Sequence, residues 1–209
     1  MITKPRLGTL NETRNGEPVY RVAELLPPQG EWSIDLFLRL NDDEGLLELV
    51  NGRLESPPVP TQRHQDVQEH LYEAIRNHAR QRNASKTNSA GIRVRLPNGN
   101  IREPDVVFMR ASNAHRRHNE YWEGADLVVE VVSSDDPKRD LVEKKAEYAS
   151  AGIPEYWIAD PRDKMLTIFT LDDGATEYRE AGRYQEGETA KSLLLAGLTV
   201  DVTAVFTGE

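Results

Sequence analysis

The chain has 209 residues, of which 38% are apolar and 29% charged, and its net charge is −9 at neutral pH. These values fit one globular domain with a single core and exclude wholesale disorder. The absence of cysteine excludes a disulfide scaffold, a thiolate zinc site and a cysteine nucleophile. Because no apolar run reaches the length of a membrane span and no apolar segment near the N-terminus marks a signal peptide, we expect a soluble cytoplasmic protein.

Positive charge is concentrated in the middle of this acidic chain. Residues 63–118 contain 11 Lys and Arg against 5 Asp and Glu, whereas the remainder carries 15 basic and 30 acidic side chains. Two interpretations are open: a surface that faces phosphates, or helix faces whose arginines are simply solvated. Charge alone favours solvated faces.

The N-terminal part predicts an arm followed by short elements. Residues 1–31 are polar and rich in Gly and Pro, which indicates an arm or irregular lead-in before one domain over 32–209. Ser33 is a suitable N-cap for a short helix that extends to Leu40. The segment LLELVNGRLES at 46–56 predicts a β-hairpin, because Asn-Gly favours a type I′ turn.

A long helix and three strands are predicted next. Over residues 62–83, apolar side chains recur every four positions from Val67 to Ala79, which is typical of a helix with one buried face. The alternating segment IRVRL at 92–96 predicts a half-buried strand. The continuous apolar runs at 106–109 and 127–132 indicate strands covered on both faces.

The remaining pattern completes one α/β domain. Asp140 to Ala151 is predicted to be a helix, ended by Gly152. Further strands are predicted, in chain order, at 155–160, 165–171, around 176–184 and around 198–202. We therefore expect a central mixed sheet flanked by helices.

Four ionisable residues stand where a sheet protein without a site would not place them. Glu48 and Glu130 interrupt apolar strands, Asp105 precedes one, and Lys144 lies in the second helix. A buried carboxylate is costly unless it is paired or bound to a metal, and two on neighbouring strands suit Mg²⁺. Each has an ordinary alternative as an exposed strand, turn or helix residue, but together they favour a site. Periodicity does not separate Lys144 from Lys145.

His64 lies on the apolar side of the long helix, three residues before Val67. It is either a core or capping histidine or part of the site. The sequence contains no Gly-rich P-loop, no G-x-S-x-G motif and no H-E-x-x-H motif, which disfavours P-loop nucleotidases, serine hydrolases and zinc peptidases of that type.

Several segments resemble the Uma-type restriction endonucleases, a large bacterial family with the PD-(D/E)XK nuclease fold. The matching segments are ELVNGRLE (48–55), RHQDV (63–67), REPDVVF (102–108), ADLVVEVVSSDD (125–136) and RDLVEKKAEYASAGIPEYWIADP (139–161). They span roughly residues 46–171, the expected core of the domain. The last is the most specific, because it contains D-x-x-x-K-x-x-x-Y.

The resemblance implies a restriction-endonuclease-like fold and assigns the site residues. Asp105 corresponds to the acid of the PD element and Glu130 to the second acid. The usual lysine two residues after that acid is replaced by Val132. The family carries its basic residue on the following helix, where the match falls on Lys144 rather than Lys145.

The resemblance also implies a metal-dependent phosphodiesterase that acts on DNA. Mg²⁺, with Mn²⁺ as a substitute, would be bound by Asp105, Glu130 and the carbonyl of Val131. Lys144 would orient or activate the water and stabilise the phosphate, Glu48 would assist a metal-bound water, and His64 would contact the phosphate or orient a carboxylate. A homodimer is expected for double-strand cutting.

Two alternatives stay open at this point. One is a catalytically inactive nucleic-acid-binding or assembly protein that retains the nuclease fold. The other is a structural protein whose acids are solvated. The intact set of four ionisable residues favours the endonuclease, whereas the net charge favours the alternatives unless the basic middle faces DNA.

Overall fold

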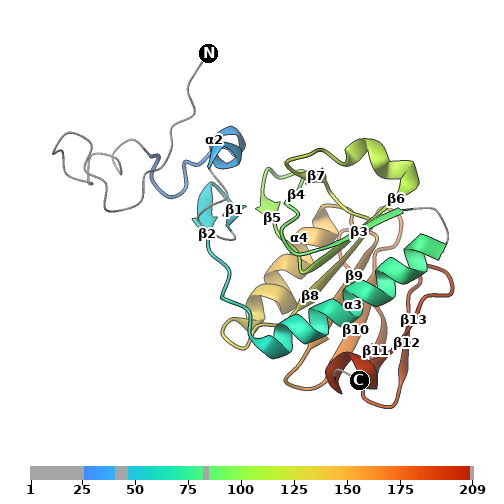
Figure 1. Cartoon of the computed structure of the whole chain (residues 1–209). Helices are drawn as coiled ribbons and strands as arrows, with labels where there is room; N and C mark the ends of the chain where they lie inside the picture. Colours follow the sequence, from blue (N-terminus) through green and yellow to red (C-terminus); the bar gives the residue numbers. More distant parts are fainter. Residues whose placement is uncertain (1–25, 41–46, 82–84, 208–209) are drawn as a thin grey trace.

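The computed structural model describes residues 26–40, 47–81 and 85–207. The predicted arm over 1–31 lies almost wholly outside these ranges. A mixed α/β arrangement is confirmed, with strands in three sheets and helices packed against them (Figure 1). In the described residues, no helix combines the length and the apolar character needed to cross a membrane.

The largest sheet has six strands in the order β11-β10-β9-β8-β6-β3. Only β8 and β9 pair in parallel; the other neighbours are antiparallel, so the sheet is mixed as predicted. The strands are β3 (Ser85–Ser89), β6 (Val106–Arg110), β8 (Leu127–Val131), β9 (Glu155–Asp160), β10 (Met165–Thr170) and β11 (Arg179–Tyr184).

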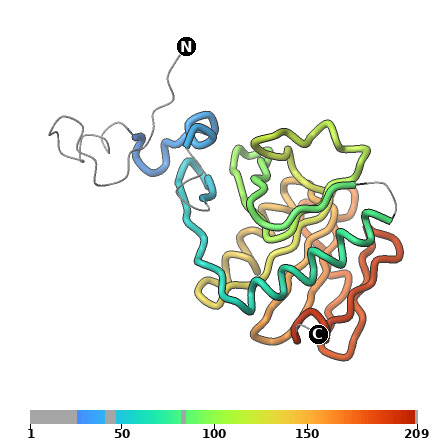
Figure 2. Tube along the Cα trace, viewed as in Figure 1, coloured from blue at the N-terminus to red at the C-terminus, as the bar shows by residue number. Residues whose placement is uncertain are grey.

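Helices cover both faces of this sheet. On one face, the long helix α3 (Gln62–Gln81) lies across the strands and buries the predicted stripe from Val67 to Ala79 (Figures 1 and 2). The same core includes α5 (Val202–Thr207) and the hairpin of β12 (Thr189–Lys191) and β13 (Thr199–Asp201). On the other face, a π-helical segment, η3 (Arg139–Lys144), continues into α4 (Lys145–Ser150).

A second sheet of five short strands carries the N-terminal elements. Its order is β2-β1-β5-β4-β7, from β2 (Arg53–Glu55), β1 (Glu48–Val50), β5 (Ile101–Arg102), β4 (Val94–Arg95) and β7 (Trp122–Glu123). It packs on α2 (Ile34–Arg39), whose first turn is capped by the Ser33 side chain. The Asn51-Gly52 turn has positive φ at both residues, as a type I′ turn requires.

Some predicted elements differ from the structure. The strand expected over 92–96 is only Val94–Arg95. The helix expected over 140–151 begins as a π-helix one residue earlier. Strands β3, β5, β7 and β12 and the short helices η2 (Ala111–Arg116) and α5 were not predicted. These elements are two to six residues long, which is too short for a periodic pattern to emerge from sequence.

Gly52 is a position where the backbone requires glycine. Its φ is +71°, and an added Cβ would lie 2.5 Å from the carbonyl oxygen of Gly30. We expect Gly52→Ala to lower the free energy of unfolding by about 2 kcal/mol or more, because strain and a backbone clash add. Gly91→Ala, at φ +86° with nothing within 4 Å, is the control and is expected to cost about 1 kcal/mol. Equal losses in urea denaturation would contradict the clash.

Candidate active site

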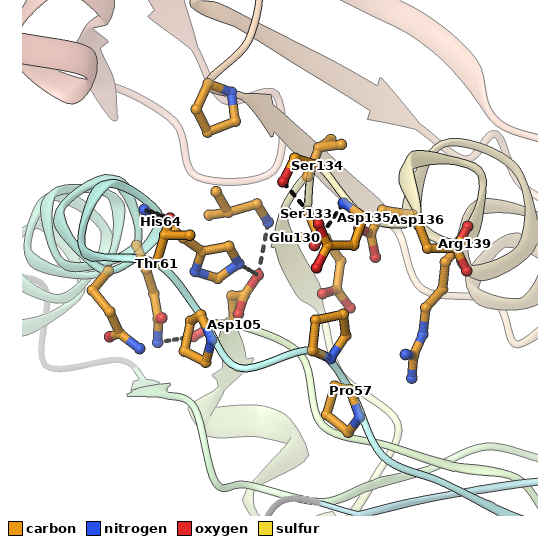
Figure 3. A pocket seen from close by; sticks show the side chains of 18 of the residues that line it. Pro57, Thr61, His64, Asp105, Glu130, Ser133, Ser134, Asp135, Asp136 and Arg139 are labelled. Atoms are coloured by element: carbon orange, nitrogen blue, oxygen red, sulfur yellow. Dashed lines mark hydrogen bonds and ion pairs between the residues drawn. The ribbon is translucent and has the colours of Figure 1, made fainter.

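A cleft of about 290 Å³ lies where α3 and β6 begin and β8 ends (Figure 3). The register explains this meeting point: β6 and β8 are antiparallel with Val106 opposite Val129, so the residue before β6 lies beside the end of β8. His64, Asp105, Glu130 and Lys144 all line this cleft. Val131 lines it as well, so five of the six predicted site residues are brought together.

Asp105 is held firmly at the cleft wall. Its Oδ2 accepts a hydrogen bond of 2.7 Å from the backbone amide of Val131 and lies 3.4 Å from Nε2 of His64 (Figure 3). Its own carbonyl accepts hydrogen bonds from the Gln68 side chain at 3.1 Å and the Ala90 amide at 2.9 Å. The carboxylate is thus oriented by contacts from β8 and α3. To orient a carboxylate was one of the two roles that the resemblance implied for His64.

Glu130 and Lys144 form a buried pair. Lys144 Nζ donates to Glu130 Oε2 at 2.9 Å, and the Tyr148 hydroxyl donates to Oε1 at 2.7 Å. Both charged side chains are almost completely buried. Lys144 Nζ also lies 3.4 Å from Asp140 Oδ1 and 3.6 Å from Glu48 Oε1. The lysine therefore shares its charge among three carboxylates.

The helix that supplies Lys144 separates it from its neighbour. Asp140, Lys144 and Tyr148 follow one another at intervals of four residues and all point inward. Lys145 instead places Nζ 3.9 Å from the centroid of the Phe169 ring, outside the residues that line the cleft. A π-helical turn is rare and often occurs at functional sites. In this chain the π-helical segment ends at Lys144, and of the two lysines Lys144 is the one that contacts Glu130.

Glu48 lies behind Lys144 and does not line the cleft. Its Oε2 accepts a hydrogen bond of 2.8 Å from Arg102 and another from Arg139, and its Oε1 accepts one of 3.1 Å from the Glu103 amide. Burial raises the pKa of Glu48, but Lys144, Arg102 and Arg139 outweigh burial and lower it to about 2. The carboxylate stays ionised and is a weak base, which suits a positioning role better than proton transfer.

The cleft carries an excess of negative charge around its lysine. Burial, together with the nearby carboxylates, raises the pKa of Glu130 to about 8 despite the attraction of Lys144. Burial likewise raises the pKa of Asp140. Although burial alone would lower the pKa of Lys144, Glu130, Glu48 and Asp140 raise it, so the ammonium stays protonated. Asp105 similarly outweighs the effect of burial and raises the pKa of His64.

The raised pKa of Glu130 predicts a pH-dependent stability. Below pH 4.5 the group is neutral in both the folded and the unfolded chain; between pH 4.5 and 8 only the unfolded chain ionises fully, so folding becomes less favourable as pH rises. Glu130→Gln removes this loss. In metal-free buffer we expect the variant to match wild type near pH 5 and to exceed its free energy of unfolding by on the order of 3 kcal/mol near pH 8. Parallel urea curves for Glu55→Gln serve as the control, and a pH-independent difference would contradict the shift.

The donor set fits a hard divalent cation. Asp105 and Glu130 offer carboxylates at one wall of the cleft, next to the backbone of Val131. Across the described ranges, no group of three or more acidic or histidine side chains forms a complete ligand shell. Mg²⁺ needs none, because it commonly uses one or two carboxylates and keeps several waters. After burial, the nearby carboxylates of Asp105, Asp140 and Glu48 contribute to the raised pKa of Glu130, and a cation in the cleft would be attracted to the same carboxylates.

Several contributors were missed from sequence. Asp140 and Tyr148 contact Lys144 and Glu130, and their four-residue spacing in D-x-x-x-K-x-x-x-Y was the available signal. Arg102, which belongs to the basic middle of the chain, is buried and paired with Glu48 and Glu147. Its charge therefore does not contribute to a phosphate-facing surface. No sequence pattern distinguished it from an exposed arginine.

Comparison with known proteins identifies the fold and the family of the chain. A crystal structure of a protein from Anabaena variabilis, described as "a putative nuclease belonging to DUF820", superposes with a TM-score of 0.68 and 16% sequence identity, over 83% of this chain and 97% of that chain. At this identity the likeness shows the fold. No curated protein matches the chain. The model of the Uma2 family, described as "Putative restriction endonuclease", matches residues 34–203. The chain therefore belongs to the Uma2 family of restriction-endonuclease-like proteins.

Proposed function

We propose that the chain is a Mg²⁺-dependent nuclease that hydrolyses phosphodiester bonds of DNA in this cleft. The observation that carries the proposal is the 2.9 Å contact between Lys144 and Glu130, beside Asp105 and in a cleft open to solvent. Two acids and one cation at the end of neighbouring strands are the groups that metal-assisted phosphate hydrolysis needs. Family membership supports the same reaction class.

Asp105, Glu130 and the carbonyl of Val131 would hold the metal. When bound, Mg²⁺ supplies a Lewis acid for the phosphate and lowers the pKa of a bound water. His64 keeps the Asp105 carboxylate oriented toward the end of β8, since its Nε2 lies 3.4 Å from Oδ2. Tyr148 fixes Glu130 through its other oxygen.

Lys144 would place a fixed positive charge beside the scissile phosphate. Its raised pKa keeps it protonated, so it orients water and stabilises the negative charge that develops on the phosphate, and it does not act as a base. Glu48 and Asp140 hold the ammonium from behind and from the preceding helical turn. Cutting both strands of a duplex would need a second site, so we expect a homodimer for double-strand cleavage.

Metal binding tests the proposal. Calorimetric titration with Mn²⁺ is expected to show binding by the wild type that Asp105→Ala and Glu130→Ala each abolish. Asp135→Ala removes an exposed carboxylate from the same cleft and is expected to bind as wild type does. Equal binding by the wild type and the Asp105→Ala/Glu130→Ala double variant would refute the metal site and leave a non-catalytic nucleic-acid-binding protein as the better interpretation.

A further inference from the structure

The positive charges of the chain's basic middle separate into two groups in the structure. The first group is engaged: Arg102 is buried against two glutamates, and Arg93 and Arg95 lie over the rings of Phe37 and Tyr121. The second group has no carboxylate partner among the described residues. It includes Arg63 at the cleft, Arg76 over the Tyr72 ring, and five residues that we name the basic end surface: Arg80, Lys86, Arg110, Arg116 and Arg117.

These five residues gather at one end of the six-stranded sheet. Lys86 and Arg110 lie on adjacent strands, since Ser85 pairs with Arg110 and Lys86 with Met109, and they flank the edge of the sheet from its two faces because side chains alternate along a strand. Helix η2, which follows Arg110 directly and ends at Arg116, contacts β3 and β6. Arg80, Lys86 and Arg110 are exposed. Asp126 lies nearby, but it is buried, and its oxygens accept hydrogen bonds from the Arg110 amide and from Asn113.

An edge strand free of acids joins this surface to the cleft. β3 ends the order of the six-stranded sheet, and its sequence from Ser85 to Gly91 contains no Asp or Glu. At its far end Ala90 lines the cleft and donates its amide to the carbonyl of Asp105. Ser, Thr and Asn side chains and backbone amides are common phosphate contacts. By contrast, the exposed face of α3 carries acids at Glu69 and Glu73.

We propose that the basic end surface binds the phosphate backbone of duplex DNA that flanks the cut site, with the DNA following β3. This inference rests on the proposed function and adds where the substrate lies. The four residue-to-residue steps from Lys86 to Ala90 span roughly 13 Å at about 3.3 Å per step. At about 3.4 Å per base pair, the anchored phosphates lie about four base pairs from the cleaved one. Figure 1 shows β3 and η2 near the end of α3 that is remote from the cleft.

The test measures DNA binding by the full chain in EDTA, so that no cleavage contributes. Fluorescence anisotropy of a labelled duplex of two helical turns is recorded across a salt series. For Lys86→Gln/Arg110→Gln we expect affinity at low salt to fall about tenfold, and the slope of log K against log salt to become shallower by about 2. Arg179→Gln/Arg183→Gln removes the same charge from exposed positions on β11, the opposite edge of the sheet, and is expected to change affinity less than about twofold.

The two double variants distinguish DNA binding by the basic end surface from a general effect of net charge. Equal weakening by both double variants, no weakening by the Lys86 and Arg110 variant, or no duplex binding by the wild type would overturn the inference. Plasmid cleavage separates it from the proposed function. If the wild type binds the duplex as expected but does not nick DNA in Mg²⁺, the nuclease proposal is refuted and DNA binding by the basic end surface stands. If the wild type nicks DNA and the Lys86→Gln/Arg110→Gln variant binds the duplex as tightly as the wild type does, the role of the basic end surface is refuted and the nuclease proposal stands.

Discussion

Lys144→Met is expected to lower the rate of Mg²⁺-dependent plasmid nicking by about 100-fold or more, the scale of losing one electrostatic stabiliser of a transition state. Lys145→Met is the matched control, because its ammonium lies over Phe169 and not in the cleft. We expect that control to keep its rate within about threefold of wild type. Nicking by Lys144→Met at the wild-type rate would show that the assigned role is wrong.

Loss of Lys144 also affects the carboxylates around it. Glu130, Asp140 and Glu48 share its charge. Lys144→Met is therefore expected to lower the free energy of unfolding by more than the same substitution at an exposed helix position would. Because its pKa is about 8, Glu130 is largely protonated at neutral pH, so the ionised Glu48 is the carboxylate that loses most when the ammonium is removed. Thermal unfolding at neutral pH must therefore accompany the rate measurement.

A second-site change tests the position of the charge. Residues i and i+2 of a strand point to the same face, so Val132 faces the same side as Glu130, in contact with the cleft. Adding Val132→Lys to Lys144→Met is expected to restore part of the nicking activity, provided that the buried strand accommodates the longer side chain. Val132→Lys alone controls for its effect on folding.

Glu48→Ala is expected to lower the free energy of unfolding by about 3–5 kcal/mol, because it leaves buried cations without their counter-charge. Glu48 is fully buried and contacts Arg102, Arg139 and Lys144. Glu55 approaches Arg102 at 3.6 Å and Arg139 at 3.8 Å, but its side chain is 39% exposed. Glu55→Ala is therefore expected to cost less than about 1 kcal/mol.

Urea denaturation of the two variants at neutral pH measures this difference. A loss for Glu48→Ala no larger than that for Glu55→Ala would contradict the role of Glu48 as the shared counter-charge. Glu48→Gln, which keeps the shape but not the charge, is expected to fall between them.

Features encoded by local pattern were predictable from the sequence. The Asn51-Gly52 turn, the α3 stripe and the strands around Asp105 and Glu130 all appear where periodicity and turn residues place them. Such features need only a few neighbouring residues to specify them. The choice of Lys144 as the partner of Glu130 came instead from the family resemblance, because periodicity does not separate Lys144 from Lys145.

Features decided by distant neighbours were not predictable. The polar strand β3, SKTNS, has no strand pattern and is fixed by pairing with β6 and packing against α3. Arg102 is buried only because Glu48 and Glu147 arrive from other parts of the chain. The same network places Glu48 behind Lys144 instead of at the cleft, whereas the resemblance implied that Glu48 assists a metal-bound water.

Nicking of supercoiled plasmid by the wild type and by Asp105→Asn is the most direct test of a metal-dependent nuclease centred on Asp105, Glu130 and Lys144. Asn keeps the size of the side chain and removes the charge that a metal would bind. The wild type should nick in Mg²⁺ and stop when EDTA is added, and Asp105→Asn should be about 100-fold slower or inactive. Equal nicking by both proteins, or wild-type nicking that persists in EDTA, would contradict the account.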